Sequence, residues 1–124
     1  MTKGQTEAEF QQKVTELARS MGIIALHIPG NVRMKDWRGW PDLTLIGTHR
    51  IMFRELKTYE NRVAGRQAFM KNRMLGAGAD WGLWTVPDLE SGQIELELRS
   101  LVEDTEEDRK DIQRQFYRAL AEAA

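Results

Sequence analysis

The sequence predicts a single α/β domain in which a mixed β-sheet is flanked by helices. The chain has 124 residues, the usual length of one domain. Apolar residues recur at helical spacing in three segments, and shorter apolar runs of strand length lie between them. Helices that interrupt a series of strands favour a sheet with helices on its faces. The expected order is α-β-β-β-α-β-β-α, with the core at about residues 6–100.

The N-terminal segment is expected to form a helix and then a strand. Residues 6–20 form an amphipathic pattern with apolar side chains three and four positions apart, at Phe10, Val14, Leu17 and Met21. Thr6 is the expected N-cap, and Gly22 is the expected end of the helix. The apolar run at 23–28 then predicts a short buried strand, and residues 29–41 are expected to form a loop.

The middle of the chain predicts a β-hairpin. Apolar runs at 43–46 and 51–56 flank the turn sequence Gly-Thr-His-Arg. With the turn centred between Thr48 and His49, Asp42 lies opposite Glu55. A shift of one residue in this register would separate the two carboxylates.

The second half of the chain predicts two helices and two strands. Helical spacing returns from residue 64 to about residue 75, and the run at 81–86 is a strand candidate. The sequence IELEL at 94–98 alternates strictly, as an edge or half-buried strand does. A last helix is expected at 105–122, with Thr105 as its N-cap. Its narrow apolar stripe packs either on the sheet or on a second subunit.

Composition and charge narrow the classes of function. The chain contains no cysteine, which excludes disulfides and cysteine-based zinc sites. No apolar run approaches the roughly 20 residues that span a bilayer, and the polar start lacks the apolar stretch of a signal peptide. We therefore expect a cytoplasmic protein without membrane contact. The formal net charge of −1 means that nucleic acid would have to be bound by a local basic patch.

Asp42, Glu55 and Lys57 form the main candidate catalytic group. Directly opposed strand residues have Cβ atoms about 5 Å apart, and Lys57 lies two residues beyond Glu55 on the same face. Opposed carboxylates repel each other unless a cation binds between them, and their oxygens suit Mg²⁺, with Mn²⁺ as a substitute. A metal there would orient a phosphate and activate water, and the lysine would assist. A turn aspartate beside a surface ion pair is the alternative interpretation.

The same residues resemble a known superfamily of nucleases. The sequence Pro-Asp at 41–42, followed by Glu-Leu-Lys at 55–57, resembles the PD-(D/E)XK superfamily, which has a restriction-endonuclease-like core. The wider pattern resembles the VRR-NUC family, through an acidic first helix (TEAEFQ), His27, RGWPDL at 38–43, FRELK at 53–57 and Gln67. The resemblance covers roughly residues 6–100. Arg54 departs from it, because the family more often has a small or apolar residue there.

The resemblance implies roles for the residues of the hairpin. Asp42 and Glu55 would bind the metal, helped by the backbone carbonyl of Leu56. Lys57 would be the catalytic lysine.

It also implies roles for residues outside the hairpin. Glu7 matches the acid of the family's first helix, with Glu9 as the alternative, and Gln67 matches a glutamine of the active site. By themselves, the two acids would be helix-terminal charges and Gln67 a solvated helix residue. For His27, we expect a satisfied histidine of the core or sheet rather than a metal ligand.

Basic and aromatic residues provide a candidate nucleic-acid surface. Arg33, Lys35 and Arg38 are expected to contact phosphates, and Arg62 and Arg66 either extend this track or form a solvated face. Trp37 and Trp40 either stack on unpaired bases or pack into the core.

The expected function is Mg²⁺-dependent hydrolysis of a DNA phosphodiester bond. Without a recognisable base-reading module, structure specificity is favoured over sequence specificity. Stand-alone proteins of the resembled family cut branched DNA in phages and bacteria, including Holliday junctions, and two symmetric cuts imply a two-fold homodimer. The alternatives are a nuclease acting on flaps, nicks or single strands, a non-catalytic nucleic-acid-binding module, and a small structural protein.

Overall fold

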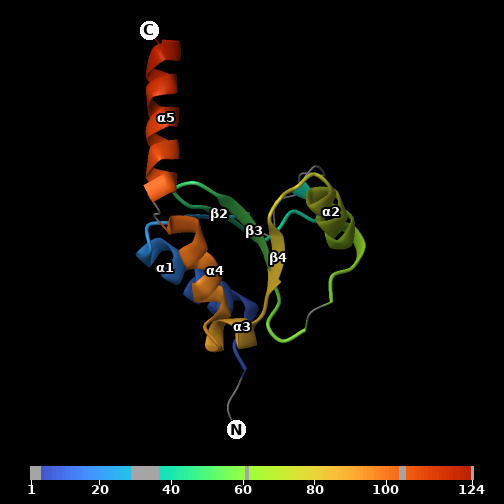
Figure 1. The fold of residues 1–124 in the computed structure, drawn as a ribbon. Helices are drawn as coiled ribbons and strands as arrows, with labels where there is room; N and C mark the ends of the chain where they lie inside the picture. The colour runs from blue at the N-terminus through green and yellow to red at the C-terminus, as the bar shows by residue number, and fades with distance from the viewer. Residues whose placement is uncertain (1–3, 29–36, 61, 104–105, 124) are drawn as a thin grey trace.

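A computed structural model describes residues 4–28, 37–60, 62–103 and 106–123 of the chain (Figure 1). The elements follow one another as α1 (Glu7–Ser20), β1 (Ile24–His27), β2 (Leu43–Ile46), β3 (Ile51–Leu56), α2 (Gly65–Gly76), β4 (Trp81–Trp84), α3 (Val86–Glu90), α4 (Gln93–Val102) and α5 (Glu106–Ala123). The predicted architecture of a mixed sheet flanked by helices is confirmed.

The four strands form one sheet in the order β1-β2-β3-β4. The first three strands are antiparallel neighbours, and β4 returns parallel to β3 after the crossover through α2. In the hairpin, Leu43 pairs with Arg54 and Ile46 pairs with Ile51. This is the register predicted from the turn, and its next position places Asp42 opposite Glu55.

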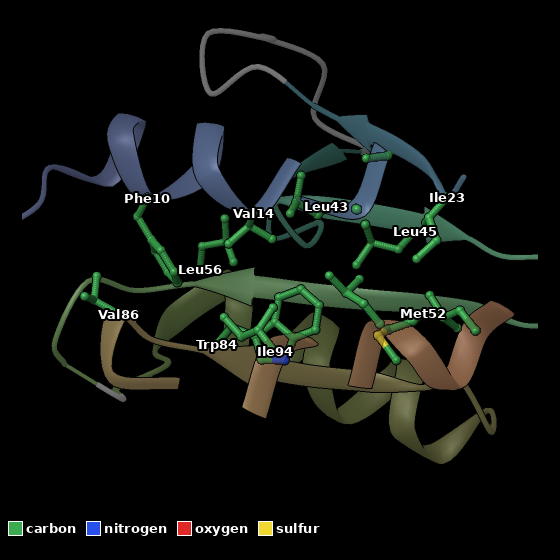
Figure 2. Packing of buried hydrophobic residues seen from close by; sticks show 14 residues of the cluster. Phe10, Val14, Ile23, Leu43, Leu45, Met52, Leu56, Trp84, Val86 and Ile94 are labelled. Atoms are coloured by element: carbon green, nitrogen blue, oxygen red, sulfur yellow. The ribbon is translucent and has the colours of Figure 1, made fainter. Parts of the chain in front are cut away.

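The main core lies between one face of the sheet and helices α1 and α4 (Figures 1 and 2). Alternate strand residues point into it, together with apolar residues from both helices: Phe10, Val14, Leu43, Leu45, Met52, Leu56, Trp84, Ile94, Leu98 and Leu101. Helix α2 lies beside β4, away from α1 and α4. The residues that alternate with the core positions, among them Phe53 and Glu55, therefore face the opposite side of the sheet.

Helix α1 begins and ends where the sequence predicts. The backbone N–H of Glu9 donates to Oγ1 of the N-cap Thr6 at 3.1 Å, which satisfies one of the free amides of the first turn. Gly22 follows the helix with a φ of +80°, a conformation that favours glycine.

The prediction that β1 is a buried strand is wrong. Ile24 is 56% exposed and Leu26 is 50% exposed, while Ala25 between them is buried. Alternate residues of β1 face α1, and Ile24 and Leu26 on its other face are not covered by the described residues.

The prediction of a strand at 94–98 is also wrong, because these residues belong to helix α4. Ile94, Leu98 and Leu101 are fully buried, whereas Leu96 is 64% exposed. Apolar residues four and three apart share one face of a helix, so a short alternating run fits both structures. The order after β4 is therefore α3-α4-α5, with the short helix α3 unpredicted.

Helix α5 extends away from the rest of the molecule (Figure 1). Its large side chains Phe116, Tyr117 and Leu120 are between 53% and 60% exposed, so they do not pack on the sheet. The predicted N-cap Thr105 lies outside the described residues. Within the part of the chain that the structure describes, no helix is both long and apolar enough to cross a membrane.

Candidate active site

Asp42 and Glu55 meet at the end of the hairpin that lies away from its turn. Asp42 immediately precedes β2, and one of its oxygens, Oδ2, accepts a hydrogen bond from the backbone N–H of Leu56 at 2.7 Å. In an extended strand, the N–H and C=O of one residue point to the same edge. The carbonyl of Leu56 therefore faces the same edge of β3 as Asp42. Backbone geometry thus holds Asp42 beside the other two candidate metal ligands, the carbonyl of Leu56 and the side chain of Glu55.

Glu55 is only 2% exposed, which is unusual for a carboxylate. Its Oε1 accepts a hydrogen bond from Nε2 of Gln67 in α2 at 3.1 Å. Its Oε2 is also buried and has no hydrogen-bond partner in the described structure. A buried carboxylate with an unpaired oxygen is unfavourable unless a proton or a cation occupies that side.

The surroundings of Glu55 raise its pKa from 4.5 to about 9. Burial is the largest cause, followed by the adjacent side chain of Asp42, which favours the protonated form of Glu55 through hydrogen bonding and through repulsion of its charge. Two carboxyl groups can share a hydrogen bond only when one of them carries a proton, so the free oxygen of Glu55 is unpaired while both are ionised. At neutral pH, the site therefore takes up a positive charge, as a proton or as a cation.

Lys57 and Glu7 act electrostatically on the same carboxylate. The charge of Lys57 lowers the pKa of Glu55, whereas the charge of Glu7 raises it. Lys57 is held beyond the end of β3 by a hydrogen bond from its backbone N–H to the carbonyl of Trp84 at 3.0 Å. Glu7, in the first turn of α1, is the helix acid whose charge reaches the site. Glu9, the alternative, is exposed, and its charge is not among those that shift the pKa of Glu55.

His27 supports the site through the backbone of Asp42. Its exposed ring lies at the end of β1, and its Nδ1 donates to the carbonyl oxygen of Asp42 at 3.1 Å. The expectation of a satisfied histidine of the sheet is confirmed, because His27 is the last residue of β1 and its ring is bonded to the residue that precedes β2.

The donor atoms fit a hard divalent cation. Asp42 and Glu55 offer carboxylate oxygens, one of them buried without a partner, and Leu56 offers a backbone carbonyl. Among the residues that the structure describes, no set of three or more His, Cys, Asp or Glu side chains is placed to hold a metal. Mg²⁺ usually keeps several water ligands beside one or two carboxylates, so the donors that are present suit it.

The predicted phosphate-binding residues are only partly within the described structure. Arg33 and Lys35 lie outside it. Arg38, Arg62 and Arg66 are exposed. A Cβ on Gly39 would overlap the backbone carbonyl of Arg66, so the segment with Arg38 lies directly against the start of α2. Arg38 and Arg66 therefore approach the same side of the molecule, next to Gln67.

Arg54 has a structural role that the sequence does not reveal. It is 4% exposed and forms ion pairs with Asp80 at 3.0 Å and with Glu97 at 2.9 Å. The other oxygen of Glu97 accepts a hydrogen bond from Nε1 of Trp84 at 3.1 Å. The network requires Glu97 to lie on a helix packed against the sheet, whereas the sequence pattern placed it on a strand.

Comparison with protein-family models, with curated proteins and with solved structures gives no match for this chain. The assignment of function therefore depends on the geometry of the site and on the sequence motifs.

Proposed function

We propose that this chain is a metal-dependent DNA endonuclease of the PD-(D/E)XK superfamily, similar to the VRR-NUC family and with a restriction-endonuclease-like core. The observation that carries the proposal is the pairing of the buried Glu55 with the half-buried Asp42, in which one oxygen of Glu55 lacks a hydrogen-bond partner among the described residues. Lys57 and Gln67 stand beside this pair, in the order and spacing of the superfamily motif.

The residues have separate tasks in this proposal. Asp42, Glu55 and the carbonyl of Leu56 would hold Mg²⁺, for which Mn²⁺ can substitute. The bound ion would polarise the phosphate and lower the pKa of a water. Lys57 orients the attacking water and stabilises the charge that develops on the phosphate. Gln67 holds the carboxylate of Glu55 through its hydrogen bond, and Glu7 adds negative charge that favours a cation.

Branched DNA, including four-way junctions, is the proposed substrate. Symmetric cleavage of a junction requires two active sites, so the proposal includes a two-fold homodimer. Helix α5 supports this part of the proposal because Phe116 and Leu120, one turn apart, are exposed on it.

A cleavage assay tests the proposal. Branched, flapped and linear DNA are incubated with the protein and Mg²⁺ or Mn²⁺, beside the variants Asp42→Ala and Lys57→Ala. We expect cleavage by the wild type, a loss of at least a hundredfold in either variant, and full activity in Lys13→Ala, which removes an exposed lysine from α1.

Two results would overturn the proposal. One is wild-type protein that cuts no DNA with either metal, and the other is equal cutting by wild type and both variants. Binding without cleavage under all conditions would instead identify a nucleic-acid-binding module.

A further inference from the structure

An aromatic strip leads from the carboxylate pair to the surface. We define the strip as Phe53, Trp40 and Trp37. Phe53 lies two residues before Glu55 on the same face of β3. The rings of Phe53 and Trp40 are 5.6 Å apart, those of Trp40 and Trp37 are 5.5 Å apart, and both pairs are edge-to-face. The strip ends at Trp37, which is 40% exposed.

Contacts with β2, β3 and α2 hold the strip in place. Nε1 of Trp40 donates to Oγ1 of Thr44 in β2 at 3.4 Å, and its ring packs on Phe53. Gly39, between the two tryptophans, has a φ of +80° and lies against the backbone of Arg66 in α2. Trp37 therefore presents an aromatic surface on a fixed support, so little conformational freedom is lost when a ligand packs against it.

Two arginines flank the strip. Arg38 follows Trp37 in the sequence. The backbone of Arg66 lies against Gly39. The guanidinium of Arg66 is 4.7 Å from the ring centre of the exposed Phe69. Neither residues 37–41 nor residues 62–69 contain an acid, although the whole chain has a net charge of −1. The local excess of arginine favours a polyanionic ligand.

From these features we propose that the aromatic strip and its arginines bind an unpaired DNA strand beside the active site. Trp37 stacks on a base, because every base offers a π-face, and Arg38 and Arg66 contact phosphates. Paired bases within a duplex do not offer this face. The preferred substrate is therefore DNA with unpaired nucleotides next to the bond that is cut. The binding of unpaired DNA is independent of catalysis, whereas its effect on cleavage rests on the nuclease proposal above.

A binding experiment without metal tests the inference. Fluorescence anisotropy in EDTA measures the affinity for a labelled oligo-dT, for an abasic oligonucleotide of the same length and for a duplex. We expect Trp37→Ala to weaken oligo-dT binding about tenfold and to leave the affinity for the abasic strand unchanged. Arg38→Ala should weaken the binding of both strands. Leu96→Ala, which removes an exposed apolar side chain from α4, is the control and should change neither.

A conservative variant and three contradicting results complete the test of unpaired-strand binding. Trp37→Phe should restore most of the oligo-dT affinity, since phenylalanine also stacks. The inference is overturned if Trp37→Ala binds oligo-dT as tightly as wild type does, if the abasic strand binds as tightly as oligo-dT, or if only the duplex binds. Cleavage is scored separately with Mg²⁺, so a protein that binds oligo-dT through Trp37 but never cuts would contradict the nuclease proposal alone.

Discussion

At the scale of single residues, Glu55 concentrates the chemistry of the site. It is nearly inaccessible to solvent, it lies beside Asp42, and one of its oxygens has no hydrogen-bond partner in the part of the chain that the structure describes. The hydrogen bond from Gln67 and the charge of Lys57 compensate only part of this environment, because the net effect is still a raised pKa. A residue so placed destabilises the metal-free protein whenever it is ionised.

The stability of the metal-free protein should therefore depend on the ionisation of Glu55. Its pKa is raised from 4.5 to about 9 on folding. The protonated side chain contributes stability that is fully present below pH 4.5 and is lost as the pH rises towards 9. In EDTA, Glu55→Gln should match wild type in Tm near the acid end of this window and exceed it at pH 8.

Thermal unfolding monitored by circular dichroism across this pH range provides the measurement. Glu90→Gln, at an exposed position, is the control and should show no pH-dependent difference from wild type. A Tm difference between Glu55→Gln and wild type that stays constant with pH would contradict the prediction.

Addition of metal should reverse the loss of stability that the ionised Glu55 causes. Millimolar Mg²⁺ or Mn²⁺ should raise the Tm of wild type at pH 8, because the ion binds the folded state alone and replaces the proton between the carboxylates. The same addition should leave the Tm of Asp42→Asn and Glu55→Gln nearly unchanged. Differential scanning fluorimetry measures this without reference to activity. Equal shifts in all three proteins would place the bound ion elsewhere.

At the scale of elements, strand β3 carries two different kinds of polar residue on its two faces. Glu55 faces the candidate site, and Arg54 faces the side of α4, where it joins the strand to Glu97 and to Asp80 before β4. The Cβ of a larger residue at Gly82 would lie 2.9 Å from the guanidinium, so the neighbouring strand leaves room for this side chain. The network aligns three elements around the strand that bears Glu55.

Removal of Arg54 should therefore destabilise the fold. Arg54→Ala leaves Glu97 and Asp80 without their partner and opens a cavity, so we expect a loss of about 2–4 kcal/mol in the free energy of unfolding. Arg99→Ala breaks an exposed pair with Glu95 and should change it by no more than about 0.5 kcal/mol. Urea titration measures both. Similar values for the two variants would show that the buried network adds no stability.

At the scale of the whole molecule, the chain combines a packed sheet domain with a projecting helix. The domain buries its apolar residues between the sheet and helices α1 and α4, whereas α5 keeps Phe116, Tyr117 and Leu120 exposed. Exposed apolar side chains at helical spacing favour packing against another helix. A second copy of α5 is the partner that the proposed symmetric cleavage requires.

Disruption of the α5 surface should therefore produce monomers. Sedimentation velocity at micromolar concentration should show a dimer for wild type and a monomer for Phe116→Glu/Leu120→Glu, because buried charges without partners oppose association. Gln113→Glu, an exposed polar position of the same helix, is the control and should remain a dimer. A monomeric wild type would contradict the dimer and the junction substrate, but not the nuclease proposal.

Local sequence patterns predicted the parts of this fold that depend on neighbours in the chain. The N-cap at Thr6, the positions of α1 and α2, and the register of the hairpin follow from side-chain chemistry and turn geometry over a few residues. The opposition of Asp42 and Glu55 follows from that register, so this part of the candidate site was also predictable.

Only the tertiary structure decided the features that depend on contacts between distant segments. The alternating run at 94–98 became a helix because α4 must cover the sheet face beside α1, and β1 became half-exposed because the described residues do not cover its other face. Glu97 as the partner of Arg54, Gln67 as the donor to Glu55, and Gly39 against Arg66 each join segments that are far apart in the chain. The sequence by itself determined the cap of α1, the register of the hairpin and the carboxylate pair, because these depend on short-range geometry. The burial of Glu55 and the support of the aromatic strip were decided by packing, because burial is a property of the whole fold and not of any single segment.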